Sequence, residues 1–404
     1  MIFSKCGKAL APIVALQLGL SGCSTPGRLA AVPAASMAMP GGTVGVTRFL
    51  VARESDSFRA EGLSSLEKEK SWLAASGRLP EQGLPPAQLL AISGGGDNGA
   101  YGAGFLNGWS ASGTRPEFKA VTGVSTGALI APFAFLGPKY DYVLKQVYTA
   151  TSQRDIFKKR GVLGGLFGDA MADTRPLAKV IEAYVTPQLL QEIADQYARG
   201  RLLLVATTNL DSLEPVIWNM TAIAASKDPD SILLFRKVLL ASASIPGAFP
   251  PVMIDVNVGG THYQEMHVDG GTMGQVFAYP PSLELNKAAP RKRILYVIRN
   301  ARLDRDWMSV ERRTLSIAAR AISALTATQG VGDLYRIYAT SERDGVDFNL
   351  TYIPASFNTP HGEEFDTAYM RSLFDVGMSA GKSGNAWQKV PPGFSTPVLA
   401  PKAN

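Results

Sequence analysis

The distribution of hydrophobic and polar positions predicts strands and helices that alternate along most of the chain. Short apolar runs that end at glycines or polar residues are typical of buried strands, and longer stretches with helical periodicity are typical of helices. Buried strands are expected at residues 89–92, 118–122, 202–206 and 294–298. Helices are expected at residues 100–109, 126–135, 141–150, 177–184, 231–240 and 308–327.

This alternation predicts an α/β fold. Apolar strands separated by helices form a mainly parallel sheet covered on both faces, so we expect a three-layer α/β/α architecture. A further helix, opened by a capping box of Ser64 and Glu67, is expected to continue to about Ala75. The chain contains no internal repeat and no second composition block. One domain over residues 48–404, with its core at about 88–300, is therefore expected.

The first residues have the pattern of a processing signal. Lys5 and Lys8 precede an apolar stretch over residues 9–20 that is too short to span a bilayer. The following Leu20-Ser21-Gly22-Cys23 is similar to the lipobox of bacterial lipoprotein precursors. That resemblance implies that residues 1–22 are removed as a signal peptide and that Cys23 is lipidated. The alternative is an ordinary secretory signal in which Cys23 is incidental.

The residues that follow extend this hypothesis. Residues 23–47 are rich in Ala, Pro, Gly, Ser and Thr and are expected to form a flexible tether between membrane and domain. By resemblance to Gram-negative lipoproteins, Ser24 favours the outer membrane, which predicts a lipid-anchored protein of the bacterial cell envelope. Removal of the signal discards Cys6 and leaves Cys23 as the only sulfhydryl. We therefore expect no disulfide framework, zinc–thiolate site or cysteine nucleophile.

The composition and charge indicate which kinds of partner the protein can bind. The 404 residues carry a formal net charge of +6, and 46% of them are hydrophobic and 18% charged. This hydrophobic content is ample for a packed core. The basic residues are scattered and form no dense stripe interleaved with aromatics, so we expect no nucleic-acid binding. The mild positive charge is compatible with a weak attraction to anionic membrane surfaces.

A glycine-rich loop follows the first core strand and opens a helix. It consists of Gly94-Gly95-Gly96-Asp97-Asn98-Gly99. Glycines at such a place let backbone N–H groups face an anion. The string also fits the G-x-G-x-x-G fingerprint of dinucleotide-binding proteins, but that fold needs an acid at the end of the second strand. Glu117 precedes that strand instead. A nucleotide-binding oxidoreductase stays open as an alternative.

A second motif, Gly123-Val124-Ser125-Thr126-Gly127, lies between a predicted strand and a predicted helix. This is the context of a nucleophile elbow, in which small flanking residues allow a tight turn and expose the serine. The other interpretation is a glycine-rich turn with a capping serine. Among three histidines, only His361 completes a serine, aspartate, histidine order, and it lies among turn formers. His262 and His267 are expected to line a strand.

A third motif, Asp269-Gly270-Gly271, offers a different base. Two glycines let the aspartate approach a helix N-terminus without obstruction by side chains. A carboxylate is a weak base at its usual pKa of about 4. Exclusion of water raises that pKa and makes the group a usable proton acceptor. The motif by itself would indicate only a turn.

In this order, the three motifs resemble the patatin-like phospholipase family, which works with a Ser-Asp dyad. The segment from Leu240 to Pro251 is similar to the part of the family that precedes the catalytic aspartate. The resemblance implies a carboxylic-ester hydrolase in which Ser125 attacks a lipid or phospholipid ester and Asp269 accepts the serine proton. It implies no metal and no organic cofactor. The implied oxyanion hole consists of Gly94, Gly95 and Gly96. The glycines that support the motifs are Gly99, Gly123, Gly127, Gly270 and Gly271.

The glycine loop departs from the family's usual pattern, and residues 158–168 form a segment that the family resemblance does not explain. Asp97 and Asn98 stand where the family usually carries a basic residue. Because an acid aimed at the oxyanion would oppose its charge, we expect Asp97 to face solvent. Residues 158–168 mix cations, glycines and large apolar residues, which suggests either a mobile flap that touches lipid or an ordinary surface loop. A catalytically silent, lipid-anchored binding protein is a further alternative.

Overall fold

A computed structural model describes residues 27–50, 53–81, 83–161, 168–288, 290–304 and 307–394. The strands are β1 (Arg48–Leu50), β2 (Ala87–Ile92), β3 (Ala120–Val124), β4 (Lys158–Lys159), β5 (Ala172–Asp173), β6 (Leu202–Asn209), β7 (Glu214–Asn219), β8 (Val252–Val258), β9 (Thr261–Asp269), β10 (Arg293–Arg299) and β11 (Val346–Tyr352). The helices are α1 (Gly42–Val46), α2 (Ser55–Ala75), α3 (Gly99–Ala111), α4 (Thr126–Leu136), α5 (Asp141–Ala150), α6 (Gln153–Ile156), α8 (Arg175–Tyr184), α9 (Pro187–Ala198), α10 (Met220–Ala225), α11 (Ser231–Ser242), α12 (Thr314–Asp344) and α13 (Thr367–Ser383). The 3₁₀ helices are η1 (Ala34–Ser36), η2 (Gly96–Asn98), η3 (Pro138–Tyr140), η4 (Gly270–Thr272), η5 (Pro281–Leu283) and η6 (Leu285–Lys287).

A nine-stranded sheet forms the centre of the molecule, in the order β1-β7-β6-β3-β2-β10-β11, with the β8–β9 hairpin attached to β6. The strands β6, β3, β2, β10 and β11 run parallel. At one edge, β7 pairs antiparallel to β6, and β1 pairs antiparallel to β7. The sheet is therefore mainly parallel, as the sequence predicted.

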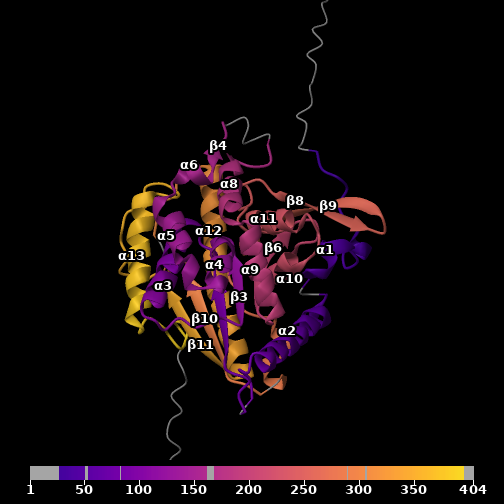
Figure 1. The fold of residues 1–404 in the computed structure, drawn as a ribbon. Helices are drawn as coiled ribbons and strands as arrows, with labels where there is room; N and C mark the ends of the chain where they lie inside the picture. The colour runs from indigo at the N-terminus through magenta and orange to yellow at the C-terminus, as the bar shows by residue number, and fades with distance from the viewer. Residues whose placement is uncertain are drawn as a thin grey trace, which may run out of the picture.

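Helices cover both faces of this sheet, because the strands of its centre are apolar on both sides. On β6, Leu203 and Val205 point to one face, and Leu202 and Leu204 point to the other. The first face belongs to the large core that includes α3, α4, α5, α8, α9, α10, α11 and α13. The second face packs against α2 and α12. In Figure 1, α3 and α13 lie side by side at the left edge. The result is the expected three-layer α/β/α architecture.

Two helices differ from the sequence expectation in their bounds. Helix α2 begins at Ser55, so Ser64 and Glu67 lie inside it and the predicted capping box is wrong. Ser65, which follows Ser64 in the same helix, is buried and donates a hydrogen bond to the Gly200 carbonyl at 2.7 Å. Helix α12 begins six residues later than predicted and continues to Asp344. Packing against the rest of the chain, rather than local signals, sets these bounds.

The segment over residues 28–47 lies against the domain instead of forming the flexible tether that the sequence predicted. Arg28 forms an ion pair with Asp211 at 2.8 Å. Val32 and Met37 are buried and belong to the large core. Apolar side chains within the Ala- and Pro-rich composition therefore attach the segment, because their burial favours docking over free motion.

The expected signal peptide over residues 1–22 and the lipidation site Cys23 lie outside the described residues. Within the ranges that the structure describes, no helix has the length and apolarity needed to cross a bilayer.

Candidate active site

Ser125 occupies the sharp turn between β3 and α4. Its backbone has φ 55° and ψ −126°, a conformation that residues other than glycine rarely adopt. A Cβ atom at Gly123 would lie 2.4 Å from the carbonyl oxygen of Gly127, and a Cβ atom at Gly127 would lie 2.3 Å from that of Ile92. Only glycine fits at these two positions. The turn has the strand-turn-helix form that the elbow motif requires.

Ser242 of α11 supports this turn. The Ser125 N–H donates to Ser242 Oγ at 3.0 Å, and the Ser242 hydroxyl donates to the Ala206 carbonyl at 2.7 Å. Ser242 is fully buried. The sequence did not single out this residue, since a serine within an apolar helix has no distinctive local signal.

Strand β6 brings Ser125 and Asp269 together, although they lie 144 residues apart in the sequence. It pairs with β3 as far as Val124 opposite Ala206, and it pairs with β9 from Thr207, which lies opposite Asp269. The ends of β3 and β9 therefore meet. Ser125 Oγ donates a hydrogen bond to Asp269 Oδ2 at 2.6 Å, and both residues are buried.

The surroundings of Asp269 raise its basicity. Burial raises the pKa of Asp269 to about 7, against the opposing effects of the Ser125 hydroxyl and the Gly271 N–H. Gly271 donates to Asp269 Oδ1 at 2.7 Å, while Gly270 and Gly271 begin the 3₁₀ helix η4. A carboxylate that loses its proton near neutral pH is matched to the task of a general base.

The glycine loop lies beside this pair. The Gly94 N–H donates to the Gln275 carbonyl at 2.9 Å, so it is already engaged. Among the described residues, no acceptor takes the N–H of Gly95 or Gly96. A Cβ atom at Gly95 would lie 2.1 Å from the Asn300 carbonyl oxygen. Of the three expected oxyanion donors, Gly95 and Gly96 are thus free to bind an anion and Gly94 is not. Gly99 is the first residue of α3.

An apolar cavity of about 80 Å³ adjoins Ser125 and Gly96. Helices α4, α5, α8 and α11 form most of its wall, to which Phe249 and Phe365 also contribute. Such walls favour a hydrocarbon chain over a polar group. Its apolar lining includes Leu129, Phe133, Val147, Leu177, Val180, Ile181, Tyr184 and Leu239.

Comparison with known proteins identifies the central domain. Residues 90–280 match the patatin-like phospholipase family. The chain carries a patatin-like phospholipase domain. The family supports a lipid-hydrolase function and a lipid substrate. The match includes the glycine loop, which removes the main reason for the dinucleotide-binding alternative. No curated protein matches the chain at the level of its sequence.

Three solved structures are similar to this chain over about two thirds or more of its length. VipD from Legionella pneumophila is 12% identical, with a TM-score of 0.38, and the match covers 77% of this chain and 70% of that protein. Human GIVD cytosolic phospholipase A2 is 11% identical, with a TM-score of 0.31 and coverage of 68% and 50%. The type III effector protein ExoU is 12% identical, with a TM-score of 0.23 and coverage of 74% and 53%. The chain spans about half the length of the last two proteins. The family assignment rests on the sequence match alone.

Asp97 of the patatin-like domain is buried, so the expectation that it faces solvent is wrong. Its Oδ2 atom accepts the Phe365 N–H at 2.8 Å and contacts His361 Nε2 at 2.7 Å. His361 stacks on Tyr369 with ring centroids 4.2 Å apart. These donors from the loop before α13 satisfy the carboxylate. His361 is therefore a partner of Asp97, and the triad order of Ser125, Asp269 and His361 does not correspond to a contact.

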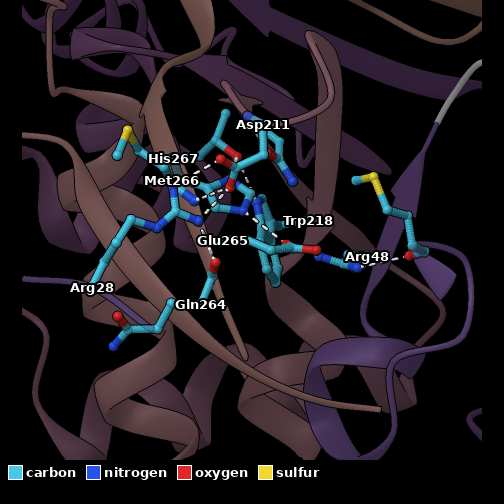
Figure 2. Close-up of polar contacts among 11 residues, drawn as sticks. Arg28, Arg48, Asp211, Trp218, Gln264, Glu265, Met266 and His267 are labelled. Carbon is cyan, nitrogen blue, oxygen red and sulfur yellow. Dashed lines mark hydrogen bonds and ion pairs between the residues drawn. The ribbon is translucent and has the colours of Figure 1, made fainter. Parts of the chain in front are cut away.

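His267 lies on β9 within a buried polar network, as Figure 2 shows. Trp218 Nε1 donates to Thr207 Oγ1 at 2.8 Å, and Thr207 Oγ1 lies 2.9 Å from His267 Nδ1. Burial lowers the pKa of His267, so its ring is neutral. Because the ionised Glu265 carboxylate can only accept, Nδ1 accepts from the threonine hydroxyl and the histidine carries its proton on Nε2. That nitrogen donates to Glu265 Oε2 at 3.1 Å, and Arg48 pairs with the same carboxylate. The expectation that His267 lines a strand is confirmed, and so is that for His262.

Other candidates from the sequence have structural roles or lie partly outside the described residues. Glu117 pairs with Arg199 at 3.3 Å, ahead of β3. In the segment 158–168, Lys158 and Lys159 form β4, which pairs with β5, while residues 162–167 lie outside the described residues. The described part of the chain contains no group of three or more His, Cys, Asp and Glu side chains arranged to hold a metal ion.

Proposed function

We propose that the protein is a serine lipid-acyl hydrolase of the phospholipase or lipase type, with Ser125 as nucleophile and Asp269 as base. The observation that carries this proposal is the 2.6 Å hydrogen bond from Ser125 Oγ to Asp269 Oδ2 beside an apolar cavity. The raised pKa of Asp269 supports it, because the carboxylate then competes for a serine proton near neutral pH.

The first half of the reaction forms an acyl-enzyme. Ser125 Oγ attacks the carbonyl carbon of the ester, and its proton moves to Asp269 Oδ2. The carbonyl oxygen becomes an oxyanion that accepts hydrogen bonds from the N–H groups of Gly95 and Gly96. The tetrahedral intermediate collapses when the bond to the alcohol breaks, and Asp269 returns the proton to the departing alkoxide.

The second half regenerates the enzyme. Water attacks the acyl carbon, Asp269 accepts a proton from it, and the same two glycines stabilise the second oxyanion. When the bond to Ser125 Oγ breaks, the proton returns to the serine and the fatty acid is released. The acyl chain lies in the cavity formed by α4, α5, α8 and α11, where apolar walls replace water around the hydrocarbon.

Chemical labelling tests this proposal. A fluorophosphonate probe phosphonylates an activated serine, so we expect labelling of the wild-type chain and its loss in Ser125→Ala. Ser64→Ala, a substitution of an exposed serine in α2, is the matched control and should label like wild type. Absence of labelling in the folded wild-type chain would favour the catalytically silent binding protein instead.

We also propose that Cys23 carries a lipid anchor in the cell envelope, at the outer membrane. The lipobox-like Leu20-Ser21-Gly22-Cys23 and the following Ser24 support this. Metabolic labelling with a palmitate analogue should mark the chain, and Cys23→Ser should remove the label without changing hydrolysis of a soluble ester. An unchanged signal in Cys23→Ser would refute the anchor.

A further inference from the structure

The first half of α12 is an amphipathic helix whose apolar side is left uncovered by the described part of the chain. Ile317, Ala321 and Leu325 follow at intervals of four residues, and Ala318 and Ile322 lie between them on the same side. Ile317 is 51% exposed, Ile322 55% and Leu325 70%. Large apolar residues at helical spacing usually face a protein core. Here they face outward.

The polar side of the same helix faces the protein. Ser316 and Arg320 are partly buried, whereas every described apolar residue from Ile317 to Leu325 is exposed. The second half of α12 has the ordinary arrangement, with Leu334 and Ile337 buried against β10 and β11. Along the chain, α12 thus changes from an outward to an inward apolar face at about Gly330. An exposed apolar face of this kind is typical of a surface that binds a partner.

This outward face stands at the catalytic edge of the sheet. A Cβ atom at Gly330 would lie 2.3 Å from the guanidinium of Arg299, whose backbone ends β10, whereas Asp344 at the other end of α12 leads into β11. The residues before Gly330 therefore extend beyond the carboxyl ends of the parallel strands, by roughly 24 Å at 1.5 Å per residue. Ser125 and Asp269 lie at that same edge. Figure 1 shows α12, in orange, running along the height of the domain.

The chemistry of the surface fits an anionic lipid bilayer. Trp307 and Met308, just before the helix, are 87% and 55% exposed, and tryptophan is the side chain most favoured at a membrane interface. Glu311, Arg312 and Arg313 follow, and Glu311 forms an ion pair with Arg313 at 3.3 Å. Residues 314–332 add one charged residue, Arg320, and no acid, so three basic residues against one acid leave residues 307–332 with a net charge of +2. An apolar face with basic residues at its side is the pattern of helices that lie in the headgroup region.

We propose that residues 307–329 form an interfacial segment that docks the catalytic edge onto anionic phospholipid. This inference rests on the proposed function, because a lipid hydrolase must bring its cavity to the membrane surface that holds its substrate. Binding inserts Trp307, Ile322 and Leu325 among the lipid headgroups. Ile245, which lines the cavity and is partly exposed, then faces the same surface.

The test measures binding and turnover separately. All samples are the full chain carrying Cys23→Ser, so that no acyl chain on that residue contributes. Vesicles contain phosphatidylglycerol mixed with phosphatidylcholine. For Ile322→Glu/Leu325→Glu we expect at least ~10-fold weaker vesicle binding and a similar loss of vesicle hydrolysis, because acidic side chains oppose both insertion and the anionic surface. Hydrolysis of a soluble short-chain ester should be unchanged.

Two controls make the result specific. Leu63→Glu changes an exposed leucine of α2, away from the catalytic edge, and should bind vesicles like wild type. Trp307→Phe should abolish a blue shift of tryptophan emission that wild type shows on adding vesicles.

Vesicle binding by the double variant equal to wild type would overturn the proposal. So would dissociation of an oligomer by the double variant, since the face would then be an interface between copies. Absence of soluble-ester hydrolysis in wild type would instead contradict the proposed function.

Discussion

Two carboxylates on β9, Glu265 and Asp269, lie four residues apart on the same side of the strand, and both are buried. Their environments have opposite effects. Burial raises the pKa of Asp269 to about 7, since a hydroxyl and one N–H oppose it only weakly. Burial alone would also raise the pKa of Glu265, but the hydrogen bond from His267 and the charge of Arg48 outweigh it and lower that pKa.

The difference shows that burial does not by itself decide the protonation of a carboxylate. In the described part of the chain, no cation forms an ion pair with Asp269, whereas Arg48 contacts Glu265 directly. Glu265, whose charge is neutralised by Arg48, is suited to hold β9 in place. Asp269, whose charge is not compensated by a cation in the described part of the chain, is suited to accept a proton. One strand thus carries a structural acid and a candidate catalytic base.

The largest effect is expected for Asp269→Asn. An amide accepts the Gly271 N–H but takes no proton from Ser125, so turnover of a soluble ester should fall on the order of 10⁴-fold. The fold should persist, which circular dichroism and thermal unfolding would check. Retention of more than about a tenth of wild-type turnover would show that another group acts as the base.

Glu265→Gln should instead affect stability. It leaves Arg48 buried without a counter-charge, which costs about 3–5 kcal/mol in the free energy of unfolding. Below the lowered melting temperature, turnover per folded molecule should stay within about twofold of wild type. Arg48→Met/Glu265→Met is the matched control, because removal of both charges should be less destabilising. A stable but inactive Glu265→Gln variant would contradict the division of roles.

The pH dependence of turnover should report Asp269. Because the base must be deprotonated, kcat/KM should fall about tenfold for each pH unit below about 7, or about 100-fold at two units below. The free energy of unfolding should change in the opposite sense. A carboxyl whose pKa is raised on folding holds its proton more tightly in the folded state, so the free energy of unfolding decreases as pH rises from about 4 to about 7. A flat rate profile down to pH ~5 would contradict the raised pKa.

The smallest effect is expected for Thr207→Val. It removes the hydroxyl that accepts from Trp218 and donates to His267, so two buried polar groups lose a partner. Unfolding free energy should fall by about 1–3 kcal/mol, measured by urea denaturation. Thr207→Ser keeps the hydroxyl and serves as control. A loss of turnover at full stability would link this network to the catalysis itself.

Elements with long apolar runs could be predicted from the sequence, and others could not. Strands β2, β6 and β10 and helices α4 and α5 lie close to their predicted positions, because buried parallel strands and their helices have strong local patterns. Strand β8 was not predicted, and β9 was expected only as a strand that His262 and His267 line, without bounds. Their apolar residues mix with polar ones such as Glu265 and His267, whose burial depends on partners from β1 and β6.

The candidate site divides in the same way. The elbow at Ser125 and the glycine loop could be proposed from sequence, because tight turns restrict the residue types that fit. Asp97 could not be placed, since its partners Phe365 and His361 come from a loop more than 260 residues away. The role of Gln275 in engaging the Gly94 N–H has no local signal either.

The sequence by itself determined which residues are chemically able to act: a serine in a strained turn, an aspartate followed by glycines, and amides in a glycine-rich loop. The tertiary structure decided which of them meet. The base beside Ser125 is Asp269 rather than His361 because β6 pairs first with β3 and then with β9, which brings the ends of those strands together. It also decided the pKa of Asp269, since desolvation, and the lack of a paired cation among the described residues, depend on the whole fold and not on neighbours in sequence.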